Sequence, residues 1–385
     1  MNINEEALKL HEEKRGKLEI KSRVKADTKE ALSLAYTPGV AEPCLRIKDN
    51  KEDCYKYTNR WNTVAVISDG SAVLGLGNIG AEASMPVMEG KAVLFKEFAN
   101  IDAIPIILAT QDTKEIIDTI KNIAPSFGGI NLEDISAPRC FEIEETLKKE
   151  LDIPVFHDDQ HGTAVVVLSG LINASKYAKK DMASLKITIN GAGAAGIAIA
   201  RILKRVGIKD IILCDSKGIV SSKRTDLAKE KKEFAVSLYG NLSDALINRD
   251  VFIGVSKANL LTKEMIGKMN SNPIIFAMAN PIPEIMPDKA YSAGAAIVAT
   301  GRSDFPNQVN NVLGFPAIFR GALDAKATQI NEEMKLSASY ALASLISDKD
   351  IKNKKIIVEP FDKRILPAVS EAVKRKAIEM GVVRK

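Results

Sequence analysis

The sequence has few of the residues that build disulfides and zinc sites. Its 385 residues include only four cysteines and three histidines. The cysteines are far apart and form no CxxC pair: Cys44, Cys54, Cys140 and Cys214. This pattern predicts reduced thiols in a cytoplasmic protein and argues against a zinc site built from cysteine. The scarcity of histidine argues against a zinc site that uses His157 or His161, which we interpret as capping or supporting residues.

Long apolar runs, a secretory signal and a strong charge imbalance are also missing. No apolar run reaches the roughly 18 residues that a membrane-spanning helix needs. Residues 1–20 are charged and helix-forming, without the apolar core of a secretory signal. The net charge is +5, from 54 basic and 49 acidic residues, and aromatic residues make up only 5%. Basic clusters such as 229–233 and 352–355 are interrupted by acids or asparagine, which indicates solvated surface. We therefore expect neither a membrane nor a nucleic-acid partner.

The remaining composition is that of a globular α/β protein with more than one domain. Apolar residues make up 46% of a chain that is too long for a single compact core. Residues 1–50 predict a helix, a loop at 35–43 and a further helix. Buried strands are predicted at 63–68, 104–108, 129–131, 186–190, 210–214, 251–255, 274–277 and 296–299. Helices are predicted at 114–122, 141–151, 162–174 and 196–206, and in the tail from 331 onward.

This alternation of strands and helices predicts that the chain is divided into two domains. Residues 1–160 form an amino-terminal α/β catalytic domain that carries the candidate metal site. Residues 161–385 form a doubly wound, parallel, Rossmann-type dinucleotide-binding domain with right-handed crossovers and a helical tail.

A glycine-rich turn follows the strand predicted at 186–190 and opens a helix. Its residues are Gly191, Ala192, Gly193, Ala194, Ala195 and Gly196. A turn without bulky side chains lets backbone N–H groups approach a pyrophosphate at the helix terminus. Asp215 ends the next strand, where a carboxylate accepts the ribose hydroxyls of NAD and repels a 2′-phosphate. Nearby cations, at Lys217, Lys223 and Arg224, leave the use of NADP open.

Two acidic pairs precede this turn. Glu133 and Asp134 follow a predicted strand, and Asp158 and Asp159 lie between residues 154–156 and a helix start. Ligands from the ends of two adjacent strands can converge on one ion, and Mg²⁺ and Mn²⁺ prefer oxygen ligands. Two other interpretations stay open at this point, namely an exposed loop for the first pair and a helix N-cap with its neighbour for the second.

With these motifs in order, the chain resembles the malic enzyme family over roughly residues 25–385. Its length and the segment 360–364 are similar to the small-subunit bacterial and archaeal branch. The segments that carry the resemblance are 36–40 (YTPGV), 68–80 (SDGSAVLGLGNIG) with Gly90 and Lys91, 131–134 (NLED), 156–164 (FHDDQHGTA), 280–281 (NP) and 310–316 (NNVLGFP).

The resemblance implies oxidative decarboxylation of L-malate to pyruvate and CO₂, with NAD or NADP and with Mg²⁺ or Mn²⁺. It implies Lys91 as the general base and Tyr36 as the general acid. It also implies the following site: Glu133, Asp134 and Asp159 as metal ligands, Asp158 as a hydrogen-bond partner of the lysine, and Asn280 and Asn311 as contacts of malate or the cofactor. Without the resemblance, Lys91 would be taken for a surface lysine and Tyr36 for a loop aromatic.

The chain departs from the large-subunit branch at one segment. An arginine that holds the substrate carboxylate there is replaced by residues 71–73 (SAV). Another cation must hold the distal carboxylate, and Arg302 and Arg139 are candidates by their placement near other motifs. The resemblance also implies a homodimer, and it leaves open whether Tyr36 acts within its own chain or reaches the neighbour's site.

Three other functions remain to be distinguished from the malic reaction. Malolactic conversion retains NAD and yields lactate, so it differs by the absence of net NADH release. A glutamate-dehydrogenase-like amino-acid dehydrogenase shares the two-domain plan but needs no paired-carboxylate metal site. A catalytically silent dinucleotide-binding module is disfavoured because all the proposed chemical residues are present.

Overall fold

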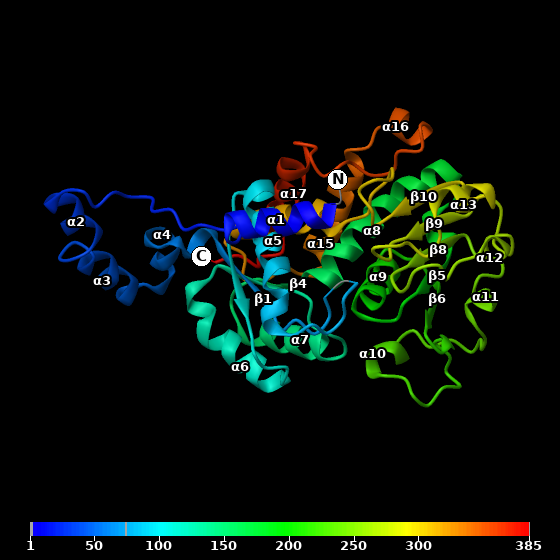
Figure 1. The fold of residues 1–385 in the computed structure, drawn as a ribbon, viewed down its shortest axis with the longest axis horizontal. Coiled ribbons are helices and arrows are strands. Elements are labelled where there is room, and N and C mark those ends of the chain that lie inside the picture. The colour runs from blue at the N-terminus through cyan, green and yellow to red at the C-terminus, as the bar shows by residue number, and fades with distance from the viewer. Residues whose placement is uncertain (1–2, 74, 385) are drawn as a thin grey trace.

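The computed structural model of the chain describes residues 3–73 and 75–384. Position 74, inside the motif at 68–80, lies outside the described residues, as do positions 1, 2 and 385 that belong to the predicted domain ranges. Two open sheets lie side by side, joined by helix α8 (Asp158–Ala178) (Figure 1). The predicted α/β class with a Rossmann-type second sheet is therefore confirmed. The four cysteines are free, as expected.

The first sheet is wholly parallel, with the order β2-β1-β3-β4. Its strands are β1 (Thr63–Ser68), β2 (Asp102–Ile107), β3 (Gly129–Leu132) and β4 (Val155–His157), connected by α5 (Ala81–Ala99), α6 (Thr113–Ile123) and α7 (Arg139–Glu150). All six residues of β1 are buried, which explains its uninterrupted run of β-forming residues. Because β3 and β4 are parallel neighbours with Leu132 paired to His157, the residues that follow them meet at one edge.

The second sheet has the order β10-β9-β8-β5-β6-β7. Its strands are β5 (Lys186–Asn190), β6 (Asp210–Asp215), β7 (Gly218–Ile219), β8 (Val251–Gly254), β9 (Ile274–Ala277) and β10 (Ile297–Thr300). The prediction that this sheet is parallel is confirmed except at one edge, where β7 pairs antiparallel with β6. Gly218 makes this tight reversal possible: its φ is +98°, and a Cβ there would lie 2.3 Å from the carbonyl oxygen of Gly240.

Helices cover both faces of the second sheet. The long α8 and α9 (Ala194–Arg205) share one apolar core with the first sheet. A separate cluster on β8, β9 and β10 packs against shorter helices. The short helices of this half are α10 (Lys229–Lys232), α11 (Leu242–Ala245), α12 (Lys263–Ile266) and α13 (Pro287–Ser292).

The carboxyl-terminal helices return to the first half of the chain. They are α14 (Phe315–Asp324), α15 (Glu332–Ser344), α16 (Asp348–Lys352) and α17 (Ile365–Glu379). Phe95 of α5 meets Phe315 and Phe319 of α14 edge to face, with ring centroids 4.8 and 5.2 Å apart. The tail that the sequence assigned to the second domain thus completes the core beneath the first sheet.

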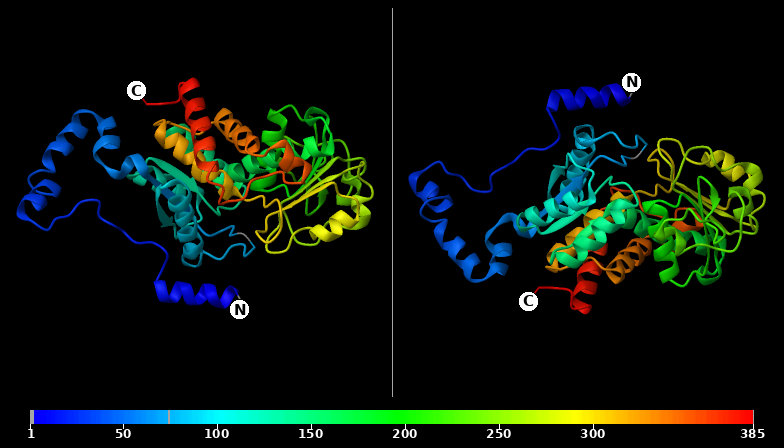
Figure 2. Two further views of the ribbon diagram at one scale, coloured as in Figure 1. Left: turned by 90° about the horizontal axis from the view of Figure 1, so that it is seen from above. Right: turned by 90° about the horizontal axis from the view of Figure 1, so that it is seen from below.

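The amino-terminal helices form an extension, which we call the arm (residues 3–50). It comprises α1 (Ile3–Lys14), α2 (Lys29–Ala35) and α3 (Ala41–Asp49), none of which has a buried residue; α4 (Cys54–Tyr57) leads into the body. Figures 1 and 2 show α2 and α3 projecting at the end of the molecule opposite the second sheet. Within residues 3–73 and 75–384, no helix has the length and apolar character that crossing a bilayer requires.

Candidate functional site

Three carboxylates converge where β3 and β4 end. An oxygen of each of Glu133, Asp134 and Asp159 lies within 4.8 Å of the other two. The backbone N–H of Asp134 donates to Asp159 Oδ2 at 2.8 Å, which joins the two strand ends. The convergence predicted from the sequence is therefore present, and we call these three residues the acid cluster.

The two simpler interpretations of the acidic pairs are wrong. Glu133 and Asp134 are each only 4% exposed, so they do not belong to an exposed loop. Asp158 is fully buried and is the first residue of α8, while the N-cap is His157, which makes no side-chain capping bond. A buried carboxylate away from a capping position needs another partner.

That partner is Lys91 on α5. Its Nζ lies 2.7 Å from Asp158 Oδ2 and 2.8 Å from Glu133 Oε1. The predicted hydrogen bond between Lys91 and Asp158 is present, and the interpretation of Lys91 as a surface lysine is wrong, because the residue is 7% exposed. The same ammonium lies 4.3 Å from the centre of the Phe315 ring, a cation–π distance.

The charges around Lys91 explain its protonation. Burial lowers the pKa of Lys91, but the carboxylates of Asp158 and Glu133 outweigh that effect, and the pKa stays above its usual range. Burial in turn raises the pKa of Glu133 and of Asp158, against the opposing effect of Lys91. The lowered lysine pKa that a general base requires is therefore not produced by the protein's own groups.

The donor set of the acid cluster fits a hard divalent cation. All three of its side chains offer carboxylate oxygens, the ligand type that Mg²⁺ and Mn²⁺ prefer. Beside it, Asp158 Oδ1 is buried without a hydrogen-bond partner among the described residues. Negative charge exceeds the single ammonium of Lys91 at this edge, so an added cation would be stabilised.

Gly162 is a site residue to which the sequence analysis gave no role. A Cβ at this position would lie 1.8 Å from Asp158 Oδ1 and 3.1 Å from the Cβ of Asn311. Only glycine leaves room for the buried carboxylate one turn earlier in α8. The same contact places Asn311, the first residue of the 3-10 helix η5 (Asn311–Leu313), against this turn. The motif at 156–164 contained Gly162, but its role depends on packing that the sequence does not show.

Glu144 of α7 supports the start of α8 and was also missed. It accepts a hydrogen bond from the backbone N–H of His157 at 3.0 Å, contacts His161 Nε2 at 2.8 Å and pairs with Lys148 at 2.6 Å. Burial raises the pKa of Glu144, but His161 and Lys148 outweigh it, so the pKa lies well below its usual range. Burial lowers the pKa of His161 to about 4. Its ring nitrogens contact Glu144 and Lys335, in agreement with a supporting role.

The glycine turn borders a cavity of about 440 Å³. It is lined by Gly191, Ala192, Gly193 and Asp215, together with residues of α7 and α10. Gly191 has a φ of +120°, and a Cβ at Gly196 would lie 1.7 Å from its carbonyl oxygen, so the turn cannot accept side chains at either position. Ala194 and Ala195 begin α9 directly after the turn. This is the geometry of a dinucleotide pyrophosphate site at a helix start.

Asp215 at the end of β6 is already paired with two cations. Arg224 contacts both of its carboxylate oxygens, at 2.8 and 3.1 Å, and Lys231 lies 2.7 Å from Oδ2. Burial raises the pKa of Asp215, but Arg224 and Lys231 outweigh it and hold the pKa at about 2. Lys217 pairs instead with Asp226, and the backbone N–H of Lys223 donates to Ser221.

The prediction that the cluster at 229–233 is only solvated surface is thus wrong for Lys231. Its partner Asp215 lies 16 residues earlier. The contact depends on how the chain folds after β6, which the pattern of the cluster does not show.

The remaining candidates lie at two places: Asn280 and Arg302 follow strands of the second sheet, and Arg139 begins α7 beside the first sheet. Asn280 follows β9 as predicted, and its carbonyl oxygen lies 3.4 Å from the position of a Cβ at Gly75. Arg302 donates to the carbonyl oxygen of Pro281 at 3.0 Å and pairs with Asp304. Arg139 donates to Asp69 at 3.1 Å. Both arginines are held by their own chain, and their proposed role toward a substrate stays a prediction.

Tyr36 is a candidate that lies on the arm, away from the body of its own chain. It ends α2 in the arm and is 67% exposed. The part of the arm that carries it, α2 with α3, projects from the body at the end of the molecule opposite the second sheet (Figures 1 and 2).

The sequence of the chain matches two protein-family models and several known proteins. Residues 13–116 and 110–148 match the model of the malic enzyme N-terminal domain, and residues 160–379 match the malic enzyme NAD binding domain. The bifunctional malic/malolactic enzyme of Bacillus subtilis is 57% identical over 390 residues, covering 100% of this chain and 95% of that protein. The NAD-dependent malic enzyme of Geobacillus stearothermophilus is 53% identical over 375 residues, covering 96% and 78%.

A solved structure shows the same fold. The malic enzyme of Pyrococcus horikoshii superposes with a TM-score of 0.95 at 44% identity, covering 100% of this chain and 92% of that one. The NAD-dependent malic enzyme of Thermotoga maritima gives 0.92 at 49% identity, covering 96% and 98%. These similarities extend over both sheets and the tail helices.

Proposed function

The chain belongs to the malic enzyme family, and on that premise we propose that it converts L-malate to pyruvate and CO₂ with reduction of NAD or NADP. The observation that supports this most directly is the position of Lys91. A buried lysine is held by Asp158 and Glu133 at the edge of a three-carboxylate cluster that fits Mg²⁺ or Mn²⁺. An amino-acid dehydrogenase does not fit this family or need such a cluster.

Glu133, Asp134 and Asp159 would hold the divalent cation, and the glycine turn with Asp215 would hold the dinucleotide. When bound, these groups would polarise the C2 oxygen of malate, offset the negative charge beside Lys91 and accept the C2 hydride. With that negative charge offset, Lys91 would lose a proton to solvent, and its neutral Nζ then receives the proton of the C2 hydroxyl while Asp158 keeps the lysine oriented. Asn280 and Asn311 contact malate or the nicotinamide part of the cofactor.

After the carboxylate on C3 leaves as CO₂, Tyr36 gives the final proton to C3 of the enolate of pyruvate, in our proposal from a second copy of the chain. The support is that Tyr36 lies on the projecting arm, together with exposed apolar side chains such as Leu32 and Leu34, which are 51% and 79% exposed. Apolar side chains on an extended segment favour burial against another surface. A homodimer with exchanged arms would bury them and deliver Tyr36 to the partner's site.

The similarity to a bifunctional malic/malolactic enzyme supports a second candidate activity. In malolactic conversion the same residues would produce pyruvate, and the retained reduced cofactor would then reduce it to lactate. The two activities differ only in whether the reduced cofactor leaves.

The test is to incubate the purified protein with L-malate, Mn²⁺ and either NAD or NADP, and to follow reduced cofactor, pyruvate and lactate together. Equal amounts of pyruvate and reduced cofactor, both abolished by a chelator, are expected. Lactate without net reduced cofactor would establish the malolactic reaction instead. Absence of turnover with both cofactors would contradict the proposal.

A further inference from the structure

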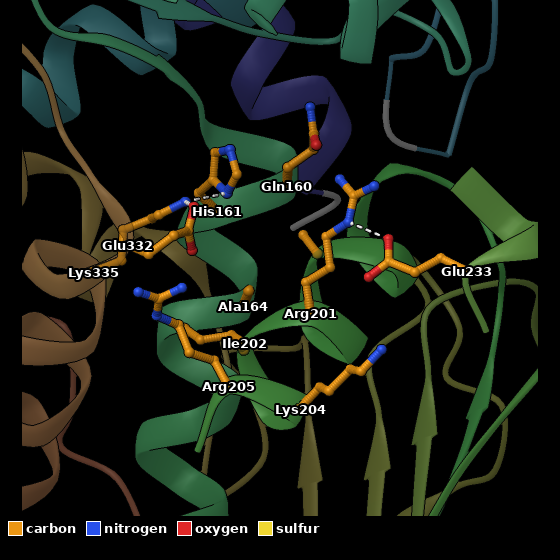
Figure 3. A pocket seen from close by; sticks show the side chains of 11 residues that line it. Gln160, His161, Ala164, Arg201, Ile202, Lys204, Arg205, Glu233, Glu332 and Lys335 are labelled. Atoms are coloured by element: carbon orange, nitrogen blue, oxygen red, sulfur yellow. Dashed lines mark hydrogen bonds and ion pairs between the residues drawn. The ribbon is translucent and has the colours of Figure 1, made fainter. Parts of the chain in front are cut away.

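A cavity of about 410 Å³ lies between α8, α9 and α15 (Figure 3). From α8 it is lined by Gln160, His161 and Ala164. Since successive helix residues are turned by about 100°, these three lie on the face of α8 opposite Asp158, Asp159 and Gly162. The cavity therefore shares a helix with the acid cluster but opens on the other side of it.

The cavity is lined with an excess of positive charge. Its described lining residues include four cations, and only two carboxylates balance them: Arg201, Lys204, Arg205 and Lys335 against Glu233 and Glu332. Arg201 pairs with Glu233 at 3.1 Å, and Arg205 pairs with Glu333, which lies outside the lining, at 2.7 Å. These pairs are partly exposed, so they exchange readily for a ligand. Figure 3 shows Arg205 on α9 facing the side where Lys335 and Glu332 of α15 lie.

Lys335 is the most unusual of these cations, because it is only 1% exposed. It pairs with Glu332 and lies 3.0 Å from His161 Nδ1. Burial and the positive charge of Lys148 lower the pKa of Lys335 to about 8, despite the opposing effect of Glu332 and Glu144. The negative charge around this ammonium is therefore insufficient, and an added anion would stabilise it.

We propose that this cavity is an effector site for a small organic dianion, a molecule with two carboxylate or phosphate groups. One anionic group lies between Arg205 and Lys335, and the other takes the place of Glu233 at Arg201. The apolar side chains of Ala164, Ala198 and Ile202 contact the carbon skeleton between them. The volume is within the range of about 300–1,000 Å³ that is usual for small-molecule sites.

A continuous set of contacts connects this cavity to the acid cluster. Lys335 contacts His161, His161 contacts Glu144 at 2.8 Å, and Glu144 accepts the backbone N–H of His157 at 3.0 Å. His157 directly precedes the first turn of α8, which carries Asp158 and Asp159. An anion that draws Lys335 toward itself changes the charge facing His161 and Glu144, and so the position of that turn. Binding at the cavity is thereby coupled to cation binding at the acid cluster.

Binding is tested by calorimetric titration of the full-length protein, stripped of metal and dialysed into metal-free buffer without chelator, with succinate and, separately, inorganic phosphate. The removal of metal keeps the acid cluster from binding the probe through a cation. We expect saturable binding of at least one probe in the wild type, weakened about tenfold or more in Arg205→Ala and in Lys335→Met. Lys209→Ala, an exposed lysine just beyond α9, is the matched control and binds like the wild type. The stronger probe distinguishes a carboxylate from a phosphate ligand.

Two results of this titration would overturn the effector site. One is the absence of binding of both probes to the wild type at millimolar concentration. The other is unchanged binding in Arg205→Ala, whose partly exposed side chain can be removed without emptying a core position.

Coupling is tested by titrating Mn²⁺ and recording free Mn²⁺ by electron paramagnetic resonance, with and without saturating probe. We expect the probe to change Mn²⁺ affinity by about fivefold or more in the wild type and not in Arg205→Ala. Equal affinities in the wild type, or the same change in Arg205→Ala, would overturn the coupling. Because neither readout uses malate or turnover, these results are independent of whether the proposed reaction is correct.

Discussion

Lys91 and Asp158 form a buried ion pair, with Nζ and Oδ2 2.7 Å apart, although they lie 67 residues apart in the chain. The lysine comes from the middle of α5 and the carboxylate from the first residue of α8. Removing one partner of a buried pair leaves the other as an uncompensated charge in the interior. The pair is therefore a sensitive point for both the chemistry and the local structure.

Replacing Lys91 is expected to abolish most turnover. Lys91→Ala should lower kcat by about 10²- to 10⁴-fold, the usual contribution of a general base. Asp158→Asn should lower kcat in the same direction, because the lysine loses its orienting charge. Lys96→Ala, on an exposed position of the same helix, serves as the control with unchanged kcat. Near-normal kcat in Lys91→Ala, with the fold verified by circular dichroism, would remove Lys91 from its proposed role.

Cation binding should depend on the acid cluster. Asp159→Asn removes a charged oxygen ligand, so we expect Mn²⁺ affinity to fall by at least about tenfold. Direct titration with detection of free Mn²⁺ measures this without substrate. Asp181→Asn, an exposed aspartate beyond the end of α8, should bind Mn²⁺ like the wild type. If the two variants bind Mn²⁺ equally well, the cation is held elsewhere.

Cofactor choice should respond to Asp215. Replacing it by serine leaves Lys231 without its carboxylate partner and Arg224 paired with Asp226 alone, so Lys231 can face a 2′-phosphate. We expect Asp215→Ser to raise the ratio of kcat/KM for NADP to that for NAD by about tenfold or more. Lys232→Ala, exposed on the same short helix as Lys231, should leave the ratio unchanged. A ratio that does not move in Asp215→Ser would show that selectivity lies in other contacts.

Asp215 should also make the free energy of unfolding depend on pH. Its pKa in the folded protein is about 2, below the value of about 3.9 of an unfolded chain. The folded state therefore binds the proton less tightly, and the carboxylate stabilises the fold above about pH 4 and loses that effect as the pH falls toward 2. In urea unfolding, the stability difference between wild type and Asp215→Asn should narrow over this range. A difference that is the same at pH 6 and pH 3 would contradict the ion pairs seen here.

If arms are exchanged between two copies, two inactive variants should restore activity to each other when mixed. A hybrid dimer contains one Tyr36→Phe chain and one Lys91→Ala chain. If Tyr36 acts in the partner's site, each hybrid dimer holds one complete site and one site that lacks both residues. Unfolding and refolding an equal mixture should then restore about a quarter of the wild-type activity, because half of the dimers are hybrids. If Tyr36 acts within its own chain, no complete site forms and activity stays at the level of the variants.

The local patterns were enough to predict the sheets and the acidic pairs. Strands such as β1 are rich in β-forming residues and buried throughout. The carboxylates follow directly on β3 and β4, so their convergence depends only on the parallel pairing of these two neighbouring strands. The burial of Lys91 could not be predicted in this way, because its partners come from other elements far along the chain. The antiparallel β7, the ion pair of Lys231 with Asp215 and the return of the tail to α5 depend on tertiary packing for the same reason.

The arm has a consequence for how the protein behaves on dilution. Its helices have no buried residue within the chain, so little in the isolated subunit stabilises the arm against unfolding or proteolysis. If arms are exchanged between two copies, part of the folding free energy is supplied by association, and the melting temperature then rises with protein concentration. The enzyme would then lose activity on dilution before its two sheets unfold, since the arm that carries Tyr36 would be released first.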